Sequence, residues 1–516
     1  MPKTIRCAAL LLFLAPLSAG AAVTCADLQK ALGGSLADIN CFKSDDLTTK
    51  NPLTTPADNS LPGLPFGAFT PTTDRSVIVA SSGRKPITKM VPGVQLDARI
   101  ASDPTSQARF LLRLPNDWNG RLVVAGASGT RSEFNGDFAW SDYVVQKGYA
   151  YASQNKGVLN LRFTAFPFPP VNLPASVTPP TPRSCRLNPS SQFWVEFYDN
   201  DDGQDFTRWA EFMIKAAELA REGVKAGYGH HPRFTYAVGT SNGGYQVRRA
   251  IESAPELFDG GVDWEGTFVD AHAPNLLTDL PPAILNFPDY AAVSKLDPDS
   301  TAAKNIRGAG YPPDMIVSTA AGPASFWGRY NGQFWEVTQC QWQKRLDPTY
   351  DTYGSGTGTY NYIARLSVSD VGAQFAAFAT TGRIQRPLVT VAGTLDALLP
   401  IDHHARAYAR KVALASKHKH HGHRDRDRDH DRDDGSRPAY RLYEVQNGNH
   451  IESYKDTTPA FPELELIEPH AQRAFDLVVE QVERGATLPP DQCVPRGKTI
   501  ADAPEQPGHC ASLFVP

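Results

Sequence analysis

The sequence predicts an α/β protein, with a mainly parallel, doubly wound sheet that is interrupted by an inserted domain. Two observations support this prediction. Short apolar strand patterns alternate with amphipathic helix patterns in both halves of the chain. Between them, at residues 261–380, the alternation fades and Trp, Pro, Asn and Tyr accumulate. Alternating strands and helices are typical of a parallel sheet covered on both faces, and the central composition is that of an inserted lid.

The core elements follow from local periodicity. Residues 204–226 show the clearest helix, because Phe206, Trp209, Phe212 and Met213 recur at helical spacing. Apolar runs bounded by Gly, Pro and Asn indicate the strands. We expect strands at 110–115, 121–125, 149–153, 234–238, 387–392 and 440–445, and further helices at 138–147, 245–253 and 469–484.

Residues 1–22 have the layout of a cleavable secretory signal. Lys3 and Arg6 precede an apolar run at 7–17, and small residues follow. That run is shorter than the roughly 20 apolar residues that span a bilayer, so a membrane anchor is the weaker alternative. We therefore expect a secreted protein, periplasmic or extracellular, without a membrane anchor.

The charge of the chain excludes one class of partner. Its 51 basic and 55 acidic side chains give a formal net charge of -4 in 516 residues. This near balance creates no strong field for nucleic acid or for an anionic membrane. Partners must therefore be inferred from binding or catalytic sites and not from net charge. The sequence does not indicate an oligomeric state.

The cysteines indicate disulfides. The chain has 7 cysteines, and removal of the signal with Cys7 leaves six, an even number. In an oxidising compartment six cysteines permit three disulfides. Cys25–Cys41 and Cys493–Cys510 are the local candidates, and Cys185–Cys340 is left as a longer link.

The chain divides into a signal at 1–22, a first core part with an irregular N-terminal wrap at 23–260, a lid at 261–380 and a second core part at 381–516. Within the last part, residues 417–437 are almost purely His, Lys, Arg, Asp and Gly. Such a run has nothing to bury and favours a disordered, solvated loop. Its histidines suggest a metal site, but alternating Arg and Asp offer few ligands at fixed geometry, so we predict none.

Residues 239–243, Gly-Thr-Ser-Asn-Gly, carry the strongest chemical signal. They follow a predicted strand and precede a predicted helix, which is the context of a nucleophile elbow. Such a sharp turn lifts the Ser241 hydroxyl out of the sheet. Side chains at Gly239 and Gly243 would clash where strand and helix approach closely.

A serine hydroxyl needs a base that is held by a third group, and after such an elbow the expected chain order is Ser, acid, His. Asp396 lies just beyond the strand at 387–392, where a triad acid belongs. A helix N-cap is the alternative role for it. The rival acids are Asp402, Asp263 and Glu265.

His450 occupies the third expected position, in a turn-rich loop directly after the strand at 440–445. We expect it to act as the general base, with Asp396 orienting its ring. His403 and His404 lie near Asp396 in the sequence and are the other histidines to consider.

Acyl transfer also needs donors for an oxyanion. The backbone N–H of Asn242, directly after the nucleophile, should supply one. The loop after an early strand should supply another, and Ala127, Ser128 and Gly129 occupy that place. An ordinary Gly-rich turn is the alternative interpretation of this loop.

With these motifs the chain resembles the tannase and feruloyl esterase family of secreted α/β-hydrolases. The resemblance covers most of the chain after the signal. It implies an α/β-hydrolase fold, a lid between nucleophile and acid, and hydrolysis of aromatic-acid esters or of related short polyester fragments. The motifs that carry it lie at 112–115, 118–121, 148–150, 236–244, 256–260, 392–400 and 448–450.

The chain departs from the family pattern in two places. Typical members carry a disulfide between a cysteine just before the nucleophile and one just after the histidine, whereas this chain has Thr240 and Ile451. The triad must then be held by packing and hydrogen bonds. The Asp-rich calcium loop of the family's lid has no convincing match before Arg383, so no calcium site is predicted. These departures suggest a divergent branch, close in kind to hydrolases of hydroxyalkanoate oligomers or of aromatic polyester fragments.

We therefore expect a serine carboxylic ester hydrolase without a cofactor. Its substrates would be aromatic-acid esters of the feruloyl, galloyl or phthalate type, or else 3-hydroxybutyrate oligomers or polyester fragments. A non-catalytic binding protein on the same scaffold is the alternative from another class. Aromatic residues could contact substrate or could equally form the lid's own core, namely Trp264, Phe326, Trp327 and Trp335.

Overall fold

The computed structural model describes residues 23–55, 87–129, 132–134, 136–158, 162–165, 184–186, 194–196, 205–272, 274–350, 358–418 and 439–516. The predicted signal at 1–22 lies outside these ranges. So does the predicted charged loop at 417–437, apart from its first two residues, which end helix α12 (Ala405–His418).

Eleven strands of the described chain form one large sheet, in the order β1-β2-β3-β5-β4-β9-β10-β13-β14-β15-β16. From β5 to β15 every neighbouring pair is parallel, and antiparallel strands extend both edges. The bounds are β1 (Leu36–Ser44), β2 (Gly93–Ile100), β3 (Arg109–Pro115), β4 (Arg121–Gly126), β5 (Ala150–Gln154), β9 (Phe234–Thr240), β10 (Gly260–Trp264), β13 (Leu388–Gly393), β14 (Tyr440–Val445), β15 (Gln492–Val494) and β16 (Gln506–Pro507).

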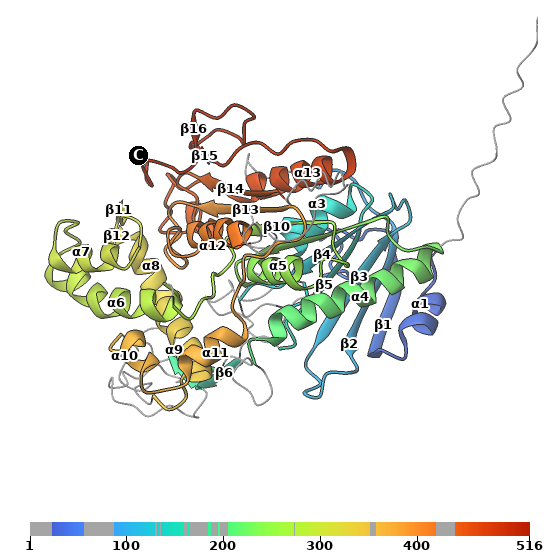
Figure 1. The fold of residues 1–516 in the computed structure, drawn as a ribbon, viewed down its shortest axis with the longest axis horizontal. Helices are drawn as coiled ribbons and strands as arrows, with labels where there is room; N and C mark the ends of the chain where they lie inside the picture. The colour runs from blue at the N-terminus through green and yellow to red at the C-terminus, as the bar shows by residue number, and fades with distance from the viewer. Residues whose placement is uncertain are drawn as a thin grey trace, which may run out of the picture.

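Helices cover both faces of this sheet (Figure 1). Strand residues alternate between two cores, so that Leu122 and Val124 pack on one side and Val123 on the other. The first side is covered by α1 (Cys25–Leu32), α4 (Arg208–Tyr228), α5 (Asn242–Ser253) and α12, and the second by α3 (Asp142–Val145) and α13 (Glu468–Arg484). This is the predicted α/β-hydrolase fold.

Helix α4 is longer than the sequence predicts. The expected end at residue 226 rested on Gly227 as a stop. In the structure Gly227 lies inside the helix, against Leu114 and Val23, and the helix ends at Gly229 in the left-handed conformation (φ +84°). Glycine terminates a helix where the backbone must turn left-handed, and Gly227 instead gives the helix room to pack on β3.

The lid is a helical segment to one side of the sheet (Figure 1). The sequence places its start at residue 261, but residues 260–264 form β10, which pairs with β9 and β13. The lid segment therefore begins after this strand. Every residue of β10 is buried, so its sequence does not show the alternation of apolar and polar residues that indicates a half-exposed strand. It contains α6 (Leu276–Pro288), α7 (Thr301–Gly308), β11 (Ile316–Thr319), β12 (Gly322–Ser325), α8 (Phe326–Gln333), α9 (Trp335–Leu346), α10 (Tyr362–Leu366) and α11 (Val371–Ala377).

A second, small sheet joins the lid from an earlier part of the chain. It pairs β6 (Arg162–Ala165), β8 (Trp194–Glu196) and β7 (Ser184–Arg186), in that order. The Cys185–Cys340 disulfide links β7 to α9. The other two disulfides are Cys25–Cys41 and Cys493–Cys510, so all three predicted pairs are present. Among the described helices, none is both long and apolar enough to cross a membrane.

Close backbone contact joins β4, β9 and α5 at the carboxyl end of the sheet. A Cβ atom at Gly239 would overlap the carbonyl oxygen of Gly243, and one at Gly243 would overlap that of Gly126. The predicted need for glycine at 239 and 243 is therefore confirmed. These contacts are made between backbone atoms, so the neighbours cannot move aside as a flexible side chain would.

We expect Gly243→Ala to lower the free energy of unfolding by about 1–3 kcal/mol, because the added methyl group meets backbone on β4. Gly308→Ala is the matched control, since a Cβ atom there has nothing within 4 Å. Thermal unfolding of the two variants measures the difference. Equal melting temperatures for both would contradict the packing argument.

Candidate active site

Ser241 lies at the turn between β9 and α5 in a strained backbone conformation. Its φ is +58° and its ψ is -122°, outside the regions that a residue with a side chain prefers. The turn is held by a hydrogen bond from the Ser241 N–H to the carbonyl oxygen of Trp264, 2.8 Å. Such strain is typical of residues that a site holds in a special orientation.

The structure brings Ser241, His450 and Asp396 into one connected chain of hydrogen bonds. His450 Nε2 lies 2.9 Å from Ser241 Oγ, and His450 Nδ1 lies 2.7 Å from Asp396 Oδ2. The other carboxylate oxygen of Asp396 accepts the backbone N–H groups of Leu398 and Leu399, at 2.8 and 2.7 Å. Asp396 therefore orients the imidazole and also organises its own loop, as an N-cap residue would.

Two of the rival acids have other partners. Asp402 forms an ion pair with Arg406, 3.0 Å. Asp263 forms a fully buried ion pair with Arg248, 2.6 Å, behind the elbow. The third rival, Glu265, differs from both, because its carboxylate lies 3.7 Å from Nδ1 of the triad histidine.

The loop that carries His450 is held from the lid. Tyr330, on α8, donates its hydroxyl hydrogen to Asn449 Oδ1. Asn449 Nδ2 in turn donates to the carbonyl oxygen of Ile451, 2.7 Å. This hydrogen bond joins the two residues that flank His450. Burial raises the pKa of Tyr330 well above its usual value, which keeps the phenol protonated as a donor. Sequence reasoning missed both residues, because only the fold brings α8 to this loop.

Asn242 begins helix α5 immediately after Ser241. Among the described residues, no acceptor takes its backbone N–H, as is usual for the first turn of a helix. Its side chain is engaged, since Asn242 Oδ1 accepts a hydrogen bond from Gln246 Nε2, 2.7 Å. The backbone donor predicted at this position is thus available beside the serine.

The loop at 126–129 lies directly against the elbow. Ser128 Oγ donates to the carbonyl oxygen of Thr240, 2.8 Å, and the carbonyl oxygen of Ala127 accepts from Gln246 Nε2, 2.8 Å. Ala127 is buried, whereas Gly129 is exposed. The predicted oxyanion loop is therefore next to Ser241, and one of its hydrogen bonds fixes Thr240.

The aromatic residues predicted as possible substrate contacts are interior residues. Phe326, Trp327 and Trp335 have no exposed surface and belong to the lid core, while Trp264, 5% exposed, packs within the sheet. Trp335 Nε1 donates to the carbonyl oxygen of Ala397, 2.7 Å, in the loop of the triad acid. The alternative that these rings form a core is the one that the structure supports, because a helical insertion must bury its own apolar face.

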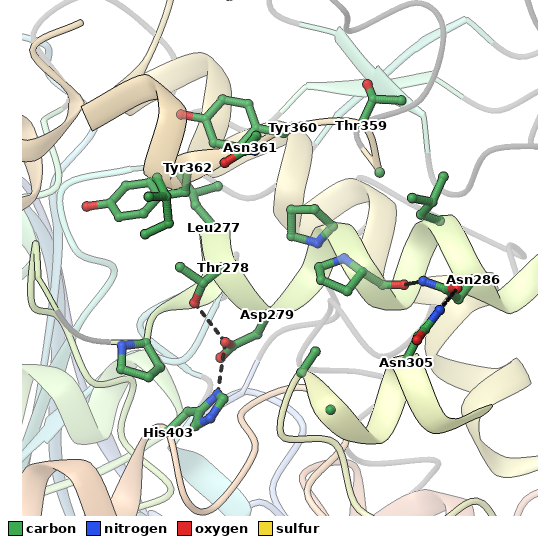
Figure 2. A pocket seen from close by; sticks show the side chains of 18 of the residues that line it. Leu277, Thr278, Asp279, Asn286, Asn305, Thr359, Tyr360, Asn361, Tyr362 and His403 are labelled. Atoms are coloured by element: carbon green, nitrogen blue, oxygen red, sulfur yellow. Dashed lines mark hydrogen bonds and ion pairs between the residues drawn. The ribbon is translucent and has the colours of Figure 1, made fainter. Parts of the chain in front are cut away.

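A cavity of about 960 Å³ opens between α6, α7 and α10, and the triad does not line it (Figure 2). At its base His403 Nδ1 lies 2.9 Å from Asp279 Oδ1 (Figure 2). The neighbouring His404 Nε2 lies 3.4 Å from the other oxygen of Asp279. His403 and His404, the remaining histidines near Asp396, thus both pair with Asp279, and His404 is buried while His403 is partly exposed. The cavity wall includes Leu277, Leu285, Asn286, Asn305, Tyr360 and Tyr362.

Part of the chain matches a known family. Residues 363–508 match the model of a family described as 3HB-oligomer hydrolase (3HBOH), a segment that includes Asp396 and His450 but not Ser241. The chain is similar to D-(-)-3-hydroxybutyrate oligomer hydrolase of Ralstonia nicotianae, with 33% identity over 24% of this chain and 15% of that protein. It is also similar to the protein of that name from Burkholderia ambifaria, with 27% identity over 26% of this chain and 17% of that protein. The chain thus matches less than a fifth of the length of these relatives.

Two solved structures align with most of the chain. Feruloyl esterase B from Aspergillus oryzae aligns with a TM-score of 0.46 and 13% identity, over 90% of this chain and 91% of that one. Tannin acyl hydrolase from Aspergillus niger aligns with a TM-score of 0.45 and 12% identity, over 90% of this chain and 87% of that one.

The His403–Asp279 pair makes a pH-dependent contribution to stability. Burial alone would lower the pKa of His403, but the hydrogen bond and charge of Asp279 outweigh it, so the pKa is raised. A raised pKa in the folded state stabilises the fold below the ordinary histidine pKa of about 6.5, and this contribution is lost as the pH rises through the raised value.

We therefore expect His403→Gln to lower the melting temperature more at pH 5.5 than at pH 9. In an Asp279→Asn background the same substitution should lose this pH dependence, because its partner no longer carries charge. Thermal unfolding of the four proteins across that pH range measures the effect. If the melting temperature of His403→Gln lies below that of the wild type by the same amount at every pH, His403 contributes by packing alone.

Proposed function

We propose that this protein is a serine carboxylic ester hydrolase that works by two-step acyl transfer. The observation that carries the proposal is the hydrogen-bonded chain from Ser241 through His450 to Asp396, at 2.9 and 2.7 Å. Ser241 Oγ attacks the ester carbonyl while His450 Nε2 takes its proton. Asp396 accepts the Nδ1–H of His450, keeps the useful tautomer and stabilises the imidazolium.

The developing oxyanion would be held by backbone donors. The N–H of Asn242 is available at the start of α5, and the positive end of the helix dipole favours negative charge at this place. A second donor would come from the loop of Ala127, Ser128 and Gly129, which packs on the elbow. His450 then returns its proton to the leaving alcohol, and water, activated by the same base, releases the acid from Ser241.

Hydroxybutyrate oligomers are the substrate class that the sequence matches favour. The matched segment, residues 363–508, carries both Asp396 and His450. Two curated relatives of the chain are named as 3-hydroxybutyrate oligomer hydrolases. Aromatic-acid esters are the second candidate, on the sequence motifs shared with tannases and feruloyl esterases. We further propose secretion, and three disulfides in the described chain support an oxidising compartment.

Ser241→Ala is expected to lower kcat/KM for an ester substrate by about 10⁴-fold or more, because the nucleophile is lost. A fluorophosphonate probe should label the wild type and not this variant. Ser253→Ala, on the exposed end of the same helix, is the matched control and should keep both labelling and turnover. A wild-type protein that neither reacts with the probe nor hydrolyses any ester would favour the binding-protein alternative.

A substrate panel separates the two ester classes. We expect kcat/KM for 3-hydroxybutyrate dimers and trimers to exceed that for ethyl ferulate, methyl gallate and dialkyl phthalates by at least about tenfold, which is 1.4 kcal/mol of transition-state binding. Ser241→Ala measured on the same panel corrects for background hydrolysis. Preference for an aromatic ester by the same margin would reverse the assignment.

A further inference from the structure

A second carboxylate points at the catalytic histidine from a different strand. Glu265 follows β10, which lies between β9, the strand of Ser241, and β13, the strand of Asp396. Parallel strands end at the same edge of a sheet, so the residues after β10 and β13 lie side by side. Glu265 takes a left-handed backbone conformation, with φ +53°, and its side chain is 1% exposed.

Both carboxylates face the same nitrogen. Asp396 Oδ2 lies 2.7 Å from His450 Nδ1, and Glu265 Oε2 lies 3.7 Å from it, about 1 Å longer than a hydrogen bond. The three side chains place one oxygen or nitrogen atom each within 4.8 Å of one another. A small side-chain movement would therefore bring Glu265 Oε2 within hydrogen-bond distance of His450 Nδ1.

The remaining contacts of Glu265 tie the site together. Its Oε1 accepts the backbone N–H of Gly393, 3.0 Å. Gly393 begins the loop that carries Asp396, residues 393–399, which we call the acid loop. Its Oε2 accepts Nε1–H of Trp264, 3.2 Å, on the strand that also holds the Ser241 turn. Glu265 thus connects the nucleophile turn, the acid loop and the base.

The surroundings of Glu265 shift its pKa. Burial raises its pKa, and the charges of Asp396 and Glu452 raise it further, whereas the Gly393 and Trp264 donors lower it. Tyr330 is the other titratable side chain that it influences. The pKa of Glu265 therefore lies well above its usual value.

We propose that Glu265 is a second positioning acid, which can accept the Nδ1–H of His450 in place of Asp396. This inference rests on the proposed triad. Without the Asp396 charge, one of the causes that raise the pKa of Glu265 is removed, and the Glu265 carboxylate accepts the Nδ1–H. When Ser241 attacks, Nε2 takes the serine proton and the resulting imidazolium pairs with Glu265. The proton then passes to the leaving alcohol, as in the native enzyme.

A double-mutant cycle tests the proposal on the full-length protein. Loss of the acid in a serine protease triad costs about 10⁴-fold, and we expect Asp396→Asn to cost less, about 10²-fold in kcat/KM. Glu265→Gln alone should cost less than about tenfold. In the Asp396→Asn background Glu265→Gln should cost a further 10²-fold, so the two effects are strongly coupled.

The pH profile is the readout that a merely structural role would not move. In Asp396→Asn, kcat/KM should rise toward alkaline pH as Glu265 ionises, and Asp396→Asn/Glu265→Gln should lack this rise. Equal costs of Glu265→Gln in both backgrounds would overturn the proposal and leave Glu265 a structural residue. If the double variant does not fold, the Asp396→Asn profile decides alone, because an alkaline rise absent from the wild type supports the proposal and a flat profile overturns it.

Ser241→Ala separates this proposal from the proposed function. If that variant keeps ester hydrolysis, the triad assignment itself fails, whatever the cycle shows. If it is inactive while the Asp396 and Glu265 effects are additive, the triad stands and only the second acid is excluded.

Discussion

The geometry of the site depends on direct backbone contact between loops that lie far apart in the sequence. Gly239 and Gly243 bring β9 and α5 together at the nucleophile turn, and a Cβ atom at Gly393 would overlap the backbone of Gly448. The acid loop therefore lies directly on the histidine loop. Leu395 strengthens this contact by donating its N–H to the carbonyl oxygen of Gly448, 2.8 Å. No side chain separates the loops at these points, so the triad distances follow from the spacing of adjacent strands.

Side-chain hydrogen bonds also hold the residues next to Ser241 and His450. The backbone carbonyl groups of Thr240 and Ile451 each accept a side-chain hydrogen bond, from Ser128 and from Asn449. Buried hydrogen bonds of this kind hold a loop as long as every partner is satisfied. The loops are therefore held in position without a cross-link that reducing conditions could break.

The lid contributes to the site through its core. The largest aromatic cluster of the lid continues into the acid loop and into the segment after the triad histidine, where Leu395, Leu398, Tyr454 and Phe461 join it. Hydrogen bonds from Trp335 and Tyr330 reach the same two loops. Packing of the lid thus stabilises the loops that carry Asp396 and His450. Substitutions in the lid interior would therefore affect the positions of Asp396 and His450.

The sequence by itself determined the α/β class, the elbow, and the order of Ser241, Asp396 and His450, and it indicated the two local cysteine pairs as candidates. These features are encoded locally, in strand and helix periodicity, turn residues and cysteine spacing. The tertiary structure decided that residues 260–264 are a core strand, that the lid aromatics are buried, and that Tyr330 and Asn449 meet. It also singled out Glu265 from three rival acids. Such contacts depend on which strands are neighbours in the sheet, and strand order is set by packing of the whole chain.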